Sequence, residues 1–151
     1  MRMLNLLTTL FFMTFVMAQE AHTIQKEIDQ NLWKPFKMAF ETIDGPALNS
    51  LYATQVLRVT PNGIDTDNKF KAANLKRFEQ HNASKTKIRL DFWFDSRKTN
   101  AKTSYEVGFY RMELKNPEGV NTIYGQFHIV LQKQEGVWKI IQDWDTTSIN
   151  G

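Results

Sequence analysis

The spacing of apolar residues changes along this sequence from one typical of helices to one typical of strands. The order of these two patterns constrains the fold more than any other feature. Between Ile24 and Ile43 apolar residues recur every three or four positions, which places them on one stripe of a helix. From Ile88 to Phe94 apolar residues alternate one by one with polar residues, and the same alternation returns in later segments before Asp145. Helices followed by a run of strands predict an α+β fold with a curved antiparallel sheet.

The helical half of the chain contains three predicted helices. The first covers about residues 24–43, and Pro35 is expected either to kink it or to begin a new segment, because proline lacks the N–H donor. Asp44-Gly45-Pro46 ends this helix and starts a second, short one. A third helix is predicted from Asp67 to His81, with Asp67 as its N-cap and a thin apolar stripe that leaves it partly exposed.

The strands are expected to follow one another as an antiparallel meander. Val56–Val59 is a short β-rich segment closed by the turn Pro61-Asn62-Gly63. Longer strands are predicted near residues 88–95, 105–114, 127–131 and 138–144. Their connections at residues 96–102, 116–119 and 134–136 are short and polar, so each strand is expected to pair with the next.

Residues 1–18 have the pattern of an export signal. Arg2 precedes an apolar run from Leu4 to Val16 that is too short to span a bilayer comfortably, and Ala18 completes a cleavage site of small residues. We therefore expect a signal peptide at 1–18, a mature chain that begins near Gln19, and one domain over 19–151 in the periplasm or outside the cell. The alternative is an uncleaved N-terminal anchor. A lipid anchor is disfavoured, because the chain has no cysteine to carry it.

Composition and motifs narrow the classes of function. The net charge of +3 is weak for a nucleic-acid-binding protein, and the basic residues between Lys69 and Lys102 are interpreted as a solvated face rather than a site for an anionic partner. The chain lacks cysteine and a Gly-x-Ser-x-Gly turn, which disfavours a nucleophilic hydrolase. Its histidines show no metal-ligand spacing, and no phosphate loop or dinucleotide fingerprint occurs. The sequence predicts no metal site, no cofactor, no nucleic-acid partner and no stable membrane anchor.

Two stretches of the sequence resemble a known superfamily. Residues 32–60, with Leu32-Trp33-Lys34-Pro35-Phe36, Leu51-Tyr52 and Val56-Leu57-Arg58-Val59, resemble the opening of small nuclear-transport-factor-2-like, or SnoaL-like, domains. The stretch Gly136-Val137-Trp138-Lys139-Ile140 resembles the last strand of that superfamily. The resemblance implies a cone-shaped fold, in which a bent sheet wraps the first helix and leaves a pocket at the open end, and it implies a homodimer. Members include isomerases, polyketide cyclases, dehydratases, binding modules and dimerisation domains, so fold alone leaves function open.

Six residues are candidates for a ligand site in such a pocket. They are the ionisable or hydroxyl-bearing residues Tyr52, Arg89, Asp91, Tyr110, His128 and Asp143. In a simple meander Arg89 and Asp91 share one face, and His128 and Asp143 are expected to share it unless a bulge shifts the register. We expect at least one of Asp91, His128 and Asp143 to line the cone. The plainer alternatives are an exposed Arg89–Asp91 ion pair, a surface His128 and an Asp143 that ends its strand.

Three functions remain open from the sequence. The first is an exported domain that binds a small, largely apolar ligand in its cone. The second is an enzyme of the isomerase, cyclase or dehydratase type, with Asp91, His128 or Asp143 as general base. The third is an interaction module that dimerises through the outer sheet face, where Trp93 or Tyr110 would be buried against a twin subunit.

Overall fold

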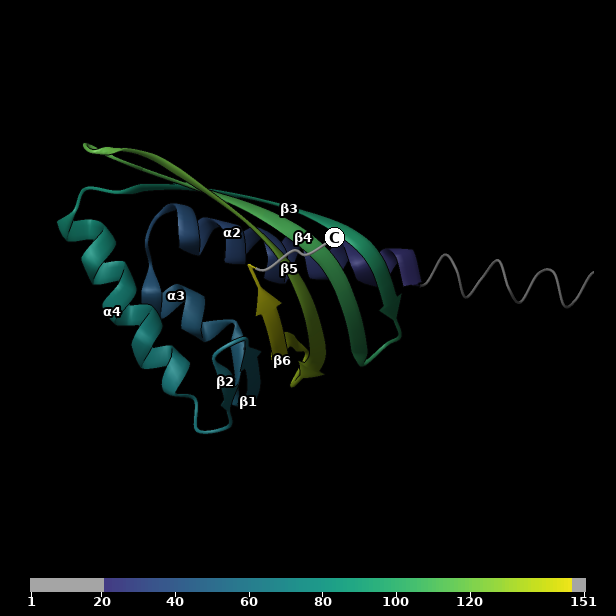
Figure 1. Cartoon of the computed structure of the whole chain (residues 1–151). Helices are drawn as coiled ribbons and strands as arrows, with labels where there is room; N and C mark the ends of the chain where they lie inside the picture. The colour runs from purple at the N-terminus through teal and green to yellow at the C-terminus, as the bar shows by residue number, and fades with distance from the viewer. Residues whose placement is uncertain (1–20, 148–151) are drawn as a thin grey trace, which may run out of the picture.

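A bent sheet with helices on its concave side makes up the structure (Figure 1). The computed structural model describes residues 21–147, so the predicted signal peptide and its cleavage site lie outside the described residues. The strands are β1 (Tyr52–Thr60), β2 (Gly63–Asp65), β3 (Lys87–Thr99), β4 (Thr103–Asn116), β5 (Gly119–Gln134) and β6 (Val137–Thr146). They form one open sheet in the order β2-β1-β6-β5-β4-β3. The predicted α+β class is confirmed.

The first helix runs without a break past Pro35, but it changes its hydrogen-bond pattern just before it. Residues 21–28 are α-helical, η1 (Asp29–Trp33) is π-helical, and α2 (Lys34–Glu41) is α-helical again. The Lys34 N–H donates to the Asp29 carbonyl, five residues back, and Pro35 next to it has no N–H to donate. The expected disturbance at Pro35 is therefore a π-helical turn, and it places Leu32 and Trp33 in the core.

The second and third helices confirm two predictions and correct one. Asp44 caps α3 (Gly45–Ser50), and its side chain accepts a hydrogen bond from the Ala47 N–H at 2.8 Å. The third helix, α4 (Lys69–Ala83), has only Phe78 fully buried, as the thin apolar stripe predicts. The assignment of Asp67 as its N-cap is wrong. Asp65 instead accepts from the Phe70 N–H at 2.7 Å.

The meander is confirmed for β3 to β6, which pair antiparallel in chain order. β1 lies beside β6 and runs parallel to it. The two strands are far apart in the sequence, so local patterns do not reveal this pairing. β3 extends into the predicted connection at 96–102, because a bulge at Asp95 lets the strand continue to Thr99. Figure 1 shows β3, β4 and β5 arching over α2, with α3 and α4 farther from them.

A second bulge, in β6, decides which side chains face inward. Ile140 pairs with Leu131 and Gln142 pairs with Val130, so Ile141 is the extra residue. Ile140 faces the core before the bulge, and Asp143 faces it after the bulge, where it lies opposite Ile129. His128 lies opposite Trp144 on the other face. The expectation that His128 and Asp143 share a face is wrong, and this bulge is the reason.

Trp33 is the centre of the core between the first helix and the sheet. Its ring lies 5.1–5.6 Å, between centroids, from the rings of Phe36, Phe92, Phe94 and Phe127. Its Nε1 donates at 2.6 Å to Glu106, which is fully buried and forms an ion pair with Arg97 at 3.0 Å. The buried Glu106 carboxylate therefore has hydrogen-bond and ion-pair partners, and its bond to Trp33 fixes the first helix on the sheet. Among residues 21–147, no helix is both long and apolar enough to cross a membrane.

Candidate functional site

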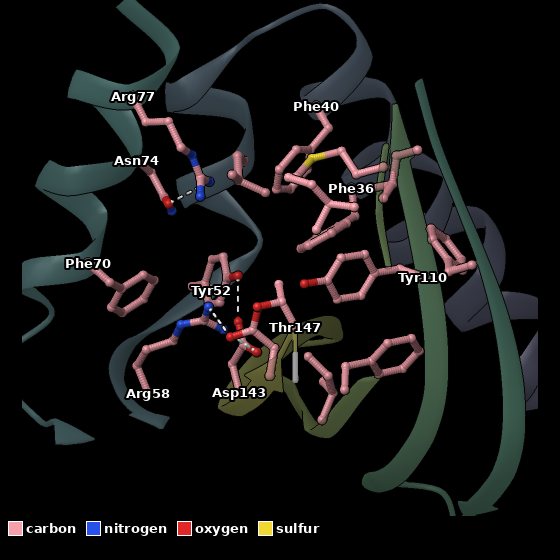
Figure 2. A pocket seen from close by; sticks show the side chains of 18 of the residues that line it. Phe36, Phe40, Tyr52, Arg58, Phe70, Asn74, Arg77, Tyr110, Asp143 and Thr147 are labelled. Carbon is pink, nitrogen blue, oxygen red and sulfur yellow. Dashed lines mark hydrogen bonds and ion pairs between the residues drawn. The ribbon is translucent and has the colours of Figure 1, made fainter. Parts of the chain in front are cut away.

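A cavity of about 440 Å³ lies between the concave face of the sheet, α2 and α4 (Figure 2). Most of its wall is aromatic or aliphatic, which is typical of sites for small organic ligands. The apolar side chains that line it are Trp33, Phe36, Phe40, Leu48, Phe70, Leu90, Phe92, Met112, Leu114, Ile123, Phe127 and Ile129. The polar residues that line it are Tyr52, Arg58, Asn74, Arg77, His81, Tyr110, Asp143, Asp145 and Thr147.

The parallel pairing of β1 with β6 builds a charged cluster in one wall of the cavity. Arg58 pairs in register with Asp143, and its guanidinium forms ion pairs with Asp143 at 2.5 Å and Asp145 at 2.6 Å. The Tyr52 hydroxyl donates to the second Asp143 oxygen at 2.8 Å. Asp143 is only 3% exposed, so this network compensates a charge that would otherwise be costly to bury.

Burial and nearby negative charge raise the pKa values of the two cavity tyrosines. Burial, followed by the negative charge of Asp143, raises the pKa of Tyr52 well above its usual value. Burial, followed by the charge of Asp145, raises the pKa of Tyr110 to about 12. Burial also raises the pKa of the Asp145 carboxyl, although the nearby Arg58 opposes this shift. The tyrosine hydroxyls are thus hydrogen-bond donors, and Asp145 is a carboxylate with a strengthened affinity for protons.

Tyr110 reaches into the cavity because a glycine lies across from it. Tyr110 on β4 pairs with Gly125 on β5, and a Cβ at position 125 would lie 2.2 Å from Tyr110 Cζ. Only glycine leaves the ring this room. Figure 2 shows the Tyr110 hydroxyl pointing across the cavity toward the side that holds Tyr52 and Asp143.

The opposite wall of the cavity comes from α4, which presents Phe70, Asn74, Arg77 and His81. Arg77 donates to the Asn74 side-chain oxygen at 3.0 Å, and its guanidinium lies 5.6 Å from the centre of the Phe40 ring. Burial lowers the pKa of Arg77. Burial, followed by the charge of Arg77, lowers the pKa of His81, which favours a neutral imidazole.

Of the six candidate residues, the structure brings Tyr52, Tyr110 and Asp143 together in the cavity. Arg89 and Asp91 do not line it, because they lie on the opposite face of β3 from Leu90 and Phe92. Asp91 instead accepts hydrogen bonds from Arg111 at 2.7 Å and from Lys37 at 3.0 Å. These bonds lower its pKa to about 2. The ion-pair alternative therefore describes Asp91 better than a cavity carboxylate does.

His128 also lies away from the cavity, on the outer sheet face. Its Nδ1 is 2.7 Å from the Tyr105 hydroxyl, and its ring lies edge-on to Trp144 with centroids 4.7 Å apart. Tyr110 belongs to the inner face, so the expectation that a twin subunit would bury it on the outer face is wrong.

Sequence reasoning missed Arg58, Asn74, Arg77, His81 and Asp145 as cavity residues. One signal was available on α4, because Phe70, Asn74, Arg77 and His81 are spaced four, three and four residues apart and so lie on one helix face. No local signal identifies Arg58, since its position depends on a parallel pairing between strands far apart in the chain. Within residues 21–147, no group of three or more carboxylates or histidines is placed to hold a metal ion.

Comparison with known proteins identifies the fold. No protein-family model matches the sequence, and a search of curated proteins finds no relative. Among solved structures, an NTF-2 like protein of unknown function from Shewanella oneidensis is similar, with 20% identity, a TM-score of 0.64, and coverage of 81% of this chain and 98% of that one. An NTF2-like superfamily protein from Salmonella enterica matches with 13% identity, a TM-score of 0.62, and coverage of 82% and 90%.

A third solved structure shares the fold. A ketosteroid isomerase-like protein from Erwinia carotovora matches with 14% identity, a TM-score of 0.55, and coverage of 74% of this chain and 87% of that one. At these identities the likeness concerns the fold and not the residues of a site. The bent sheet around the first helix, together with these neighbours, shows that the chain has the nuclear-transport-factor-2-like fold.

Proposed function

We propose that this chain is an exported domain that binds a small, largely apolar ligand in the cavity between α2, α4 and the sheet. The observation that carries the proposal is the cavity itself, about 440 Å³ with a mostly aromatic and aliphatic wall. Burial of apolar ligand surface there contributes about 25 cal/mol per Å² to binding, before the cost of immobilising the ligand.

The polar residues of the cavity orient such a ligand. Tyr110 presents a protonated hydroxyl, and Asp145 presents a carboxylate whose charge Arg58 partly balances. A ligand with one oxygen-bearing end and an apolar body satisfies both regions, because its polar atoms find partners while its body excludes water from the aromatic wall.

Binding is tested with N-phenyl-1-naphthylamine, a neutral apolar probe that fluoresces when it leaves water. We expect saturable binding to the folded protein, and at least tenfold weaker binding by Met112→Trp, which fills the cavity from β4. Val137→Trp is the matched control, because Val137 is 50% exposed and lies outside the cavity. Equal binding by both variants would place the probe elsewhere and contradict the proposal.

A second candidate function is proton transfer, favoured by the raised pKa of Asp145 beside Tyr110. In this reading the Asp145 carboxylate removes a proton from carbon next to a carbonyl, and the Tyr110 hydroxyl donates to the oxygen that becomes negative. One solved structure with the same fold is described as ketosteroid isomerase-like. The test is hydrogen–deuterium exchange of a cyclic ketone followed by NMR, where Asp145→Asn abolishes any exchange that the wild-type protein accelerates.

A third candidate is dimerisation through the outer sheet face. Trp93 is 53% exposed and pairs in register with Phe109, which is 37% exposed, so two aromatic side chains lie next to each other in solvent. An exposed aromatic patch of this kind is typical of a protein interface. A homodimer and a ligand-binding cavity are compatible, because they use opposite faces of the sheet.

A further inference from the structure

We infer that the ligand of the cavity carries an anionic group, a carboxylate or sulfonate, that pairs with Arg77 on α4. This inference rests on the proposed binding function and specifies its ligand as an amphipathic anion.

The cavity has two cationic guanidinium groups, and within residues 21–147 only that of Arg58 forms ion pairs with carboxylates. Arg77 interacts with the charge of Asp145 at longer range. Arg58 forms ion pairs with both Asp143 and Asp145. Arg77 forms none with a carboxylate of the described residues, although it lines the same cavity. A ligand with one negative charge supplies the partner that Arg77 lacks.

Arg77 is positioned by a chain of amide hydrogen bonds. Its Nη2 donates at 3.0 Å to Asn74 Oδ1, and the Asn74 amide donates at 3.1 Å to Asn49 Oδ1. Asn49 in turn donates to the Lys71 carbonyl at 2.9 Å, which ties the chain to the backbone of α4. A guanidinium that is already oriented loses less conformational entropy when an anion binds.

The guanidinium of Arg77 lies against two aromatic rings, which help to hold it in place. Its guanidinium carbon lies 5.6 Å from the Phe40 ring centre and 5.5 Å from the Phe78 ring centre. Arg77 is an exposed residue, so an anion can reach it from solvent. In Figure 2, Arg77 points into the cavity from α4, on the side away from Arg58 and Asp143. An anion at Arg77 therefore leaves the apolar body of the ligand beside Phe36 and Phe40.

The test compares two probes with the same ring system. N-phenyl-1-naphthylamine is neutral, and 8-anilinonaphthalene-1-sulfonate adds one sulfonate to the same framework. We expect the wild-type protein to bind the sulfonate at least tenfold more tightly than the neutral probe, since hydrogen bonds to charged groups have this order of effect. Arg77→Gln is expected to weaken binding of the sulfonate more than binding of the neutral probe, and so to remove that preference. Arg77→Lys keeps the charge and is expected to retain part of the preference.

Arg89→Gln is the matched control, because it removes the same charge from a side chain that is 64% exposed and lies outside the cavity. It should keep the preference, and thermal unfolding of each variant checks that the fold is retained. If the neutral probe binds but the sulfonate binds no more tightly, or if Arg77→Gln weakens both probes equally, the anion inference is wrong while the binding function stands. If neither probe binds the wild-type protein, both proposals are wrong.

Discussion

Arg58 is the residue on which the cavity cluster depends, because one guanidinium serves two carboxylates. It lies 2.5 Å from Asp143 and 2.6 Å from Asp145. Without it, two negative charges would face each other in a buried wall, a state that proteins avoid by protonation or unfolding. A change at Arg58 therefore affects both the cavity and the stability of the fold, and ligand binding and unfolding must be measured separately.

The stability side is tested by Asp143→Ala. The change removes one of the two carboxylate partners of Arg58 and the acceptor of the Tyr52 hydroxyl, and we expect the free energy of unfolding to fall by about 3 kcal/mol. Urea denaturation measures it. Asp67→Ala is the control, because Asp67 is 65% exposed and its ion pair with Lys69 lies on the surface, where a change within about 0.5 kcal/mol is expected. If the free energy of unfolding falls no further in Asp143→Ala than in Asp67→Ala, the cluster adds no stability.

Asp91 gives a prediction for pH. Its pKa is lowered to about 2, first by the hydrogen bond from Arg111 and then by that from Lys37. The unfolded value is about 3.9. Because the folded pKa is the lower one, the stabilisation is fully present above about pH 4 and is lost as the pH falls toward 2.

Asp91→Asn should accordingly show a shallower loss of stability than the wild-type protein between pH 4 and 2, measured as unfolding free energy at a series of pH values. At neutral pH the variant should be the less stable of the two. Parallel acid profiles for the two proteins would rule out this assignment.

At the scale of elements, the pairing of β4 with β5 shapes the cavity, because β5 has a glycine opposite Tyr110 of β4. Gly125 leaves room for the Tyr110 ring, and a Cβ there would lie 2.2 Å from Tyr110 Cζ. Gly125→Ala should displace the ring and lower stability by about 1–3 kcal/mol, as overpacked core sites do.

A double-mutant cycle separates this contact from any effect on β5 itself. In the background of Tyr110→Ala the ring is absent, so adding Gly125→Ala should cost markedly less than it does in the wild-type protein. Additive losses in the two backgrounds would mean that Gly125 is needed by the strand rather than by the tyrosine.

The elements themselves were largely predictable, because each has a local signal. The segment Asp44-Gly45-Pro46, the alternation from Ile88 to Phe94 and the polar turns all predict elements that the structure contains. The faces of the last strand were not predictable, since a bulge at Ile141 has no strong sequence signal and changes which residues point inward. For this reason Asp143 was expected on the same sheet face as His128 and lies on the opposite face, where it contacts Arg58.

At the scale of the whole molecule, we propose a homodimer that uses the outer sheet face. Trp93→Glu should convert the dimer to a monomer, because it places a charge at the centre of the exposed aromatic pair with Phe109. Sedimentation at micromolar concentration measures the mass. Ile64→Glu on β2 is the control, since Ile64 is 71% exposed on another part of the sheet. A wild-type protein that sediments as a monomer contradicts the proposal directly.

Export is a further proposal at this scale. Arg2 and the apolar run from Leu4 to Val16 predict that a bacterial host cleaves the chain before Gln19 or within a few residues of it. Intact-mass measurement of the secreted protein tests this. Recovery of a chain that still contains Met1 to Ala18 would refute cleavage.

The bulge in β6 also matters for reading related genes. Ile141 adds one residue between the core-facing Ile140 and the cavity-facing Asp143, so this strand is one codon longer than a regular partner of β5 would be. An ungapped alignment with a relative whose strand is regular would match either Ile140 or Asp143 to the correct position, but never both. If Ile140 is matched correctly, Asp143 is equated with a residue on the outer face of the sheet. Transfer of site residues across this strand therefore requires a gap at Ile141.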